Sequence, residues 1–197
     1  VPYAPASPLW SDGAEKSRWI AVPNAGSIDS AADRISIASE NWKFPAGTVL
    51  MKHFEMPVDA NDPAKSKRLE TRFIICLPDG DKYGITYRWL DDGSDAVLMN
   101  ARSTINYTVR QKSGTPVTRE WTVLGRADCL ACHNAAAGQA LGLKTHQLNH
   151  LFTYASTGLV KNQMATLGYL GLISPLRPAL LESADGSFWY VIMPIRI

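Results

Sequence analysis

Apolar and polar residues alternate at a period of two in several short stretches over the first 124 residues, which is the pattern of half-buried β-strands. In the clearest stretch, 83–90, one face holds only apolar and aromatic side chains: Tyr83, Ile85, Tyr87 and Trp89. Turn sequences rich in Pro, Gly and Asp separate the stretches, for example at 78–81 and 91–93. We therefore predict an antiparallel meander or sandwich with strands over residues 47–55, 69–77, 83–90, 96–100, 104–111 and 117–123.

The apolar residues near the C-terminus follow a helical spacing instead. This spacing predicts a helix over 143–153 and a helix over 159–170 that ends before Gly171. The run over 187–193, after Pro175 and Pro178, is predicted to be a closing strand. The predicted fold class is therefore α+β, with a β-sandwich-like antiparallel N-terminal portion over 1–124. A short helical segment with the closing strand, over 125–197, completes one integrated domain.

Five residues in the helical segment, Cys129-Leu130-Ala131-Cys132-His133, have the spacing of the attachment signature for c-type haem. Two thiols three positions apart lie on one side of a helical turn, so each can add to a vinyl group of haem. The histidine that follows can then supply an axial nitrogen to the iron. Because the chain has only three cysteines, the motif is specific. We predict one covalent haem c, anchored by Cys129 and Cys132, with His133 as the proximal ligand and Asp128 as the N-cap of the helical turn.

Two other kinds of site also use closely spaced cysteines. A structural zinc site takes four Cys or His ligands, but Cys76 stands alone and His53, His146 and His150 lie at none of the usual finger spacings. A thioredoxin-like CxxC belongs at the strand-to-helix junction of a βαβ unit, and the neighbourhood of the motif lacks that alternation. Haem is the favoured interpretation, and zinc and redox chemistry are the alternatives. In the apolar stretch 72–77, Cys76 is predicted to be a buried, inert thiol.

Composition and charge exclude some classes of partner. The formal net charge is +2 over 197 residues, so no broad basic surface for nucleic acid is expected. No apolar run reaches the length of a membrane span. The chain begins at Val1 without Met, which indicates a mature or excised fragment. We expect a monomer or one domain of a larger protein.

Several further segments carry a resemblance to a known family. They are Pro8-Leu9-Trp10-Ser11-Asp12-Gly13-Ala14, the stretch 44–54, Leu69-Glu70-Thr71-Arg72, the stretch 83–89, the stretch 128–133, and Gln147-Leu148-Asn149. In this order, over roughly residues 8–171, the chain resembles bacterial c-type cytochrome domains that are often attached to, or encoded beside, PQQ-dependent sugar or sorbosone dehydrogenase-like proteins.

This resemblance implies a monohaem electron carrier rather than an enzyme. Haem attachment in such proteins takes place outside the bacterial inner membrane, so the family implies a periplasmic or secreted protein. It also implies a redox partner that acts on carbohydrates or alcohols, either a quinoprotein dehydrogenase or a copper oxygenase. The alternative function is a haem enzyme or gas-binding sensor, in which the sixth position of the iron is open or displaceable.

The sixth iron ligand decides between these functions. The candidates are His53, His146, His150, Met51, Met56, Met99, Met164 and Met193. We expect His53 first, because it lies in a strand with apolar neighbours and a buried histidine needs a partner, and Met164 next. Arg126, ahead of Lys144, is expected to pair with the haem propionates. The charged residues on or beside the strands, such as Glu70 and Arg72, are expected to form ion pairs on the sheet surface.

Overall fold

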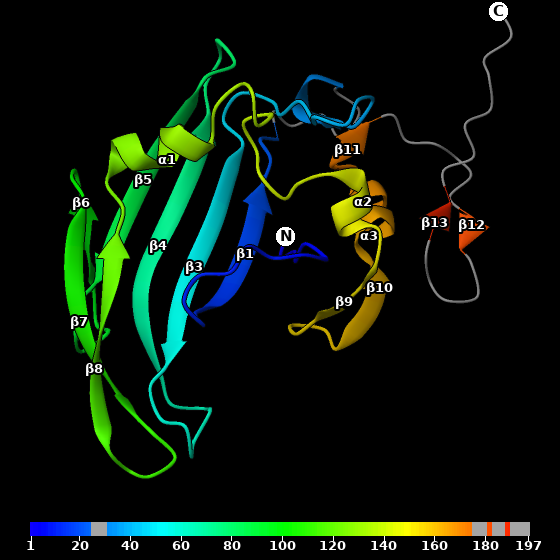
Figure 1. Ribbon diagram of the computed structural model, residues 1–197. Helices are drawn as coiled ribbons and strands as arrows, with labels where there is room; N and C mark the ends of the chain where they lie inside the picture. Colours follow the sequence, from blue (N-terminus) through cyan, green and yellow to red (C-terminus); the bar gives the residue numbers. More distant parts are fainter. Residues whose placement is uncertain (25–30, 175–180, 183–187, 190–197) are drawn as a thin grey trace, which may run out of the picture. The chain divides into compact units, whose positions relative to one another are not determined.

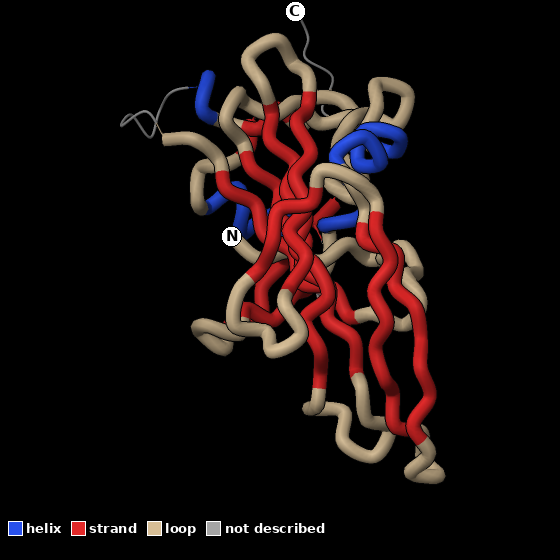
Figure 2. Tube along the Cα trace, turned by 90° about the vertical axis from the view of Figure 1, so that its left-hand side faces the viewer, coloured by secondary structure: helices blue, strands red, loops and turns tan. Residues whose placement is uncertain are grey.

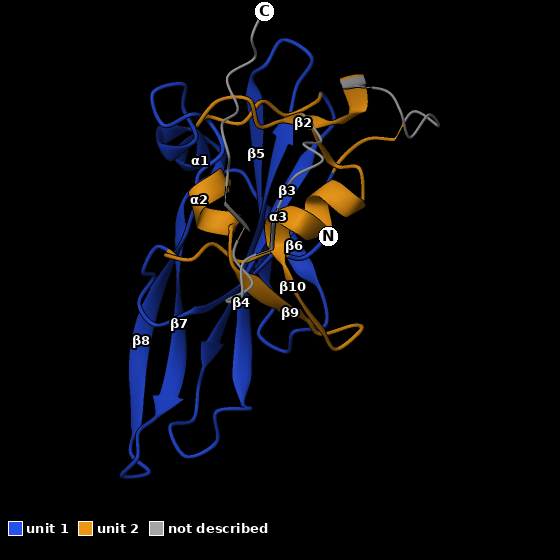
Figure 3. Ribbon diagram, turned by 90° about the vertical axis from the view of Figure 1, so that its right-hand side faces the viewer, with its two compact units in different colours: residues 1–2, 9–21, 46–141 blue, residues 3–8, 22–45, 142–197 orange. Residues whose placement is uncertain are grey.

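The computed structural model describes residues 1–24, 31–174, 181–182 and 188–189. The chain divides into two compact units, which Figure 3 shows in different colours. Unit 1 comprises residues 1–2, 9–21 and 46–141, and unit 2 comprises residues 3–8, 22–45 and 142–197. The CxxCH motif belongs to unit 1, the same unit as the long strands.

Unit 1 is built on a five-stranded antiparallel sheet in the order β1-β3-β4-β5-β6 (Figure 1). Its strands are β1 (Glu15–Ala21), β3 (Val49–Pro57), β4 (Ser66–Cys76), β5 (Lys82–Trp89) and β6 (Ala96–Met99). A β-bulge interrupts the pairing of β3 with β4 between Phe54 and Glu55. Figure 2 shows the long strands in red. The predicted antiparallel strands are confirmed.

A second, smaller layer of unit 1 is the hairpin β7 (Ser103–Arg110) and β8 (Pro116–Val123). It packs on one face of the sheet through a buried apolar cluster made of Ala14, Phe54, Met56, Leu69, Tyr107, Trp121 and Val123. Burying such side chains is the main stabilising contribution to a fold of this kind. The predicted sandwich is therefore present only in part, as a sheet covered by a two-stranded hairpin.

The cross-strand register determines which residues share a face of the sheet. Arg18 of β1 is opposite Lys52 of β3, which is opposite Arg72 of β4, which is opposite Thr86 of β5. Residues directly opposite each other project to the same side, so these four form one row across the sheet. Because neighbours along a strand alternate between faces, His53 projects to the other side.

Unit 2 contains short elements joined by turns. They are η1 (Ala31–Asp33), β2 (Ile35–Ser36), α2 (Thr145–Leu148), β9 (Leu151–Tyr154), β10 (Leu159–Asn162), α3 (Gln163–Tyr169), β11 (Ile173–Ser174), β12 (Leu181–Glu182) and β13 (Phe188–Trp189). Strand β11 pairs in parallel with β2, and the other pairs are antiparallel. Of the predicted closing strand over 187–193, only Phe188–Trp189 is described, and the rest lies outside the described residues.

The two helices predicted for unit 2 are wrong in their extent. The first is the single turn α2, after which 151–154 pair with 159–162 as a hairpin whose turn contains Gly158 at a φ of 69°. The second begins only at Gln163, because the Asn162 side chain accepts hydrogen bonds from the backbone of the first helical turn. Its predicted stop is confirmed, since Gly171 has a φ of 68° just after the helix.

No helix in the described part of the chain is long and apolar enough to cross a lipid bilayer.

Candidate functional site

Helix α1 (Arg126–Cys132) carries both motif cysteines and lies beside β5 (Figure 1). Its N-cap is Gly125, and Asp128 occupies the third helical position, so the predicted N-cap at Asp128 is wrong. The Asp128 carboxylate accepts a hydrogen bond from the Gly125 N–H at 2.9 Å and one from Nη2 of Arg102 at 2.6 Å. A carboxylate here satisfies an orphan backbone donor and complements the helix dipole.

The Cys129 side chain packs directly onto the backbone of β5. It is 5% exposed, and its Sγ lies 3.8 Å from Oγ1 of Thr86 and 3.7 Å from the Gly125 carbonyl oxygen. A Cβ atom added at Gly84 would come within 2.6 Å of the Cys129 Cβ. Only glycine at position 84 allows the helix to approach the strand this closely.

The thiols of the chain lie in different environments. All three cysteines are free, with Cys129 and Cys76 buried and Cys132 exposed. Burial raises the pKa of the Cys129 thiol and that of the Cys76 thiol. The predicted burial of Cys76 is confirmed. The Cys129 sulfur therefore lies against the sheet, whereas Cys132 is exposed to solvent.

The His133 imidazole follows α1 and is held by one hydrogen bond. Its Nδ1 lies 2.8 Å from the Gln139 carbonyl oxygen. A carbonyl can only accept, so Nδ1 carries the proton and Nε2 carries the lone pair. Within the described residues Nε2 has no hydrogen-bond partner. A histidine that ligates a metal characteristically donates its other ring nitrogen to a carbonyl or carboxylate in this way.

The loop that supplies this carbonyl has a left-handed backbone. Gly138 has a φ of 72° and Gln139 a φ of 61°, which is uncommon for a residue with a side chain. The Gln139 N–H donates to the Asn134 carbonyl at 2.8 Å and keeps the loop closed. The loop therefore orients the imidazole.

The electrostatic surroundings of His133 favour the neutral ring. Burial lowers the pKa of His133, and the positive charges of Lys52 and Arg72 lower it further, against the effect of the Gln139 carbonyl. The neutral ring is the form that binds a metal.

His53 is not brought to His133. Lys52 and Thr86 project from one face of the sheet, and Cys129 packs over Thr86 on that face. His53 projects from the other face. Its ring nitrogens are both engaged, Nδ1 with Oγ1 of Thr71 at 2.7 Å and Nε2 with Oε1 of Glu55 at 3.1 Å. We therefore withdraw His53 as the expected sixth ligand.

The face that carries His53 forms a hollow of about 460 Å³ lined almost entirely by apolar and aromatic side chains. These are Trp19, Met51, Phe73, Tyr87, Trp89 and Ala96, with Thr71 beside them. The His53 ring stands edge-on to Trp89, with 5.8 Å between the ring centroids. Aromatic packing and two hydrogen bonds thus account for this histidine without a metal.

The other predicted groups are distributed over both units. The Arg126 guanidinium lies over the Tyr83 ring at 3.6 Å from its centroid, a cation–π contact. Lys144 pairs with Glu40 in unit 2. Of the remaining sixth-ligand candidates, Met51, Met56 and Met99 lie in unit 1, His146, His150 and Met164 lie in unit 2, and Met193 lies outside the described residues.

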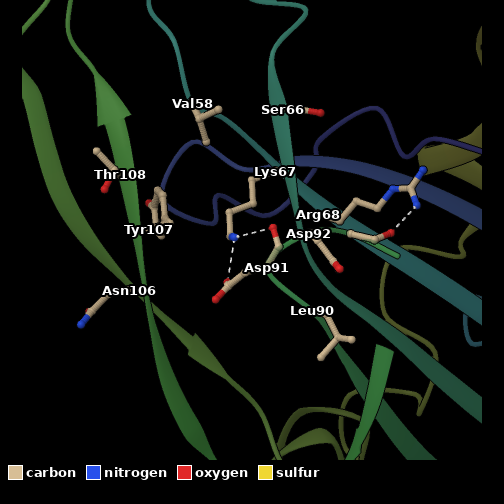
Figure 4. Close-up of a pocket in the computed structure, with 11 residues that line it drawn as sticks. Val58, Ser66, Lys67, Arg68, Leu90, Asp91, Asp92, Asn106, Tyr107 and Thr108 are labelled. Atoms are coloured by element: carbon tan, nitrogen blue, oxygen red, sulfur yellow. Dashed lines mark hydrogen bonds and ion pairs between the residues drawn. The ribbon is translucent and has the colours of Figure 1, made fainter. Parts of the chain in front are cut away.

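A second hollow, of about 670 Å³, lies at the end of the sheet where β4 begins (Figure 4). Lys67 reaches across it to Asp91, at 2.9 Å between Nζ and Oδ1, and Nη1 of Arg68 donates to the Gly93 carbonyl at 3.3 Å. Lys67, Arg68 and Asp91, which line this hollow, therefore already have partners within the protein.

The described residues contain no group of three or more His, Cys, Asp or Glu side chains placed to hold a metal ion. Comparison with protein-family models, with curated proteins and with solved structures gives no match to this chain.

Sequence reasoning did not identify Gly84 or Gln139 as parts of the site. An isolated glycine in a strand pattern signals a close backbone approach, and this signal is present at Gly84. The prediction that Glu70 and Arg72 form an ion pair on the sheet surface is wrong about the surface, because Glu70 is fully buried. The signal here is a charge within an otherwise apolar face, because Glu70 and Arg72 alternate along β4 with residues of the opposite face and lie in line with Ile74 and Cys76.

Proposed function

We propose that the protein is a monohaem c-type cytochrome that carries single electrons. The observation that supports this most is the geometry of His133, which follows the two free motif cysteines in the sequence. Its Nδ1 donates to the Gln139 carbonyl, so the lone pair on Nε2 is available to a metal. These donors fit a covalent haem, since two thioethers and one imidazole are what the group requires.

Each element of the site has a separate task in this proposal. Cys129 and Cys132 hold the porphyrin through thioether bonds, and His133 supplies the proximal nitrogen. Packing of α1 against Gly84 and Thr86 fixes the motif on the sheet. The haem, when bound, supplies one-electron redox chemistry, and the protein supplies binding and electrostatics.

An electron carrier needs an accessible contact surface, and the outer side of α1 offers one. Leu130 is 38% exposed and Cys132 is exposed, so a small apolar area adjoins the attachment point. Electron-transfer contacts are typically small and transient. On the resemblance in sequence, we propose a periplasmic or secreted location and a quinoprotein dehydrogenase or copper oxygenase as the redox partner.

The sixth iron position distinguishes this function from the alternative, a haem enzyme or gas-binding sensor in which that position is open or displaceable. For a carrier we expect the ferrous spectrum to be low-spin and unchanged by carbon monoxide, because the sixth position is filled by a protein ligand. The optical spectrum of the reduced protein, recorded before and after addition of the gas, provides the test.

The variant His53→Ala serves as the matched control, and its spectrum should equal that of the unsubstituted protein because His53 lies on the other face of the sheet. A carbon monoxide adduct in the unsubstituted protein would contradict the carrier and support the sensor or enzyme. An adduct only in His53→Ala would reinstate His53 as the ligand.

A further inference from the structure

A row of cationic side chains crosses the sheet next to the haem motif. Arg18, Lys52 and Arg72 are directly opposite one another on β1, β3 and β4, and Thr86 follows on β5. Cys129 of the motif contacts Thr86. Like charges directly opposite each other on adjacent strands destabilise a sheet, so the row has a cost that an anion would offset.

The charged groups of Lys52 and Arg72 both lie against the ring of Phe54. Nζ of Lys52 lies 4.8 Å and the guanidinium carbon of Arg72 lies 4.5 Å from the centroid of Phe54. Phe54 is 1% exposed, so the two charges stand on an apolar floor with weak solvation. An anion bound there would be held more strongly than on an open surface.

The carboxylate of Glu70 lies beside Arg72 in this row and is shared between two donors. Glu70 accepts a hydrogen bond from Nη2 of Arg72, and it also accepts one from Nε1 of Trp121 at 3.0 Å. Nε of Arg72 is buried without a hydrogen-bond partner, and within the described residues Nζ of Lys52 has neither a hydrogen bond nor an ion pair. Burial, with the charges of Arg18, Arg72 and Lys16, lowers the pKa of Lys52 to about 8, whereas Glu70 acts in the opposite direction.

The row also ends beside the motif. Lys52 is opposite Arg72, Arg72 is opposite Thr86, and Oγ1 of Thr86 lies 3.8 Å from Sγ of Cys129. An anion that binds beside His133 and has carboxylates to offer is the haem itself, through its two propionates. Ammonium and guanidinium groups are the donors suited to carboxylates.

Resting on the proposed function, we propose that Lys52 and Arg72, with Arg18 beside them, bind the propionate groups of the haem. Arg126, which the sequence suggested for this role, is instead stacked on Tyr83. The cations would have a second effect, because positive charge near the iron disfavours the ferric state and raises the reduction potential.

The test uses the haem-loaded full chain and the variant Lys52→Gln. Loss of the cation should favour the ferric state by about tenfold at a fixed ambient potential, which lowers the midpoint by about 59 mV for one electron. Spectroelectrochemical titration measures this shift, and the propionate bending band in the resonance Raman spectrum should move with it. Lys52→Arg should keep both properties close to the original.

The matched control is Lys112→Gln, which removes the same charge at an exposed position between β7 and β8 of the same unit. Arg72→Gln should lower the reduction potential as Lys52→Gln does. Lys52→Gln is the primary variant because it leaves the buried Glu70 paired with Arg72. Equal potentials in Lys52→Gln and Lys112→Gln would overturn the proposal. A potential shift with an unmoved propionate band would also overturn it, because the charge would then act only through space. A chain that carries no haem would instead refute the proposed function.

Discussion

Replacement of both Cys129 and Cys132 by alanine is expected to abolish covalent haem attachment, from one haem per chain to none. The only other thiol, Cys76, lies in β4 outside the CxxCH motif, with neither a second cysteine nor a histidine at the motif spacing, so it does not substitute for them. The measurement is haem-specific staining and intact mass of the denatured protein, after production with the haem-attachment machinery.

Single replacements separate the two sulfurs. Cys129→Ala and Cys132→Ala should each keep one thioether and a reduced yield of attached haem, whereas His133→Ala should keep attachment and lose the proximal bond, with a changed spin state. His53→Ala is the control with unchanged attachment and spectrum. If the double cysteine variant still carried haem covalently, the motif would not be the attachment site.

The variant Gly84→Ala is expected to lower the free energy of unfolding by roughly 1–3 kcal/mol, the usual cost of overpacking. The new Cβ would meet the Cys129 Cβ at 2.6 Å, and both atoms are rigidly attached to backbone, so α1 or β5 must shift. Urea denaturation of the haem-free chain measures the change.

A double-mutant cycle with Cys129→Gly isolates this contact. The Cys129→Gly background lacks the opposing Cβ, so Gly84→Ala should change the free energy of unfolding there by less than about 0.5 kcal/mol. An equal cost in both backgrounds would show that α1 does not pack on β5 at this position. In the haem-loaded protein, Gly84→Ala should also reduce the yield of attached haem.

The strands of unit 1 were predictable because the period-two pattern and the turn residues agree. In the stretch 83–90, apolar alternation and the flanking turns at 78–81 and 91–93 point to the same element, and β5 is found at Lys82–Trp89. The helix expected over 143–153 failed for the opposite reason. Leu148, Leu151 and Phe152 fit a helical spacing, but 151–154 pair with 159–162 across a turn that uses Gly158.

The candidate site was predictable only where it is local in sequence. The spacing of Cys129, Cys132 and His133 is readable from the chain, whereas the expectation of His53 as a sixth ligand depended on which face of β3 lies on the side of α1. His53 and Lys52 are neighbours, and a shift of one residue exchanges their faces. The contact of Cys129 with Gly84 and Thr86 decides the matter, and it places Lys52 and Arg72, not His53, on the face that α1 covers.

The most direct test of the central claim is the intact mass of the denatured chain after production together with the bacterial haem-attachment machinery. We expect the mass of the polypeptide plus one haem, with an alkaline pyridine spectrum shifted from that of free haem b because both vinyl groups are saturated by the Cys129 and Cys132 thioethers. A chain with the mass of the polypeptide alone, or a haem that acidified organic solvent extracts completely, would contradict the account.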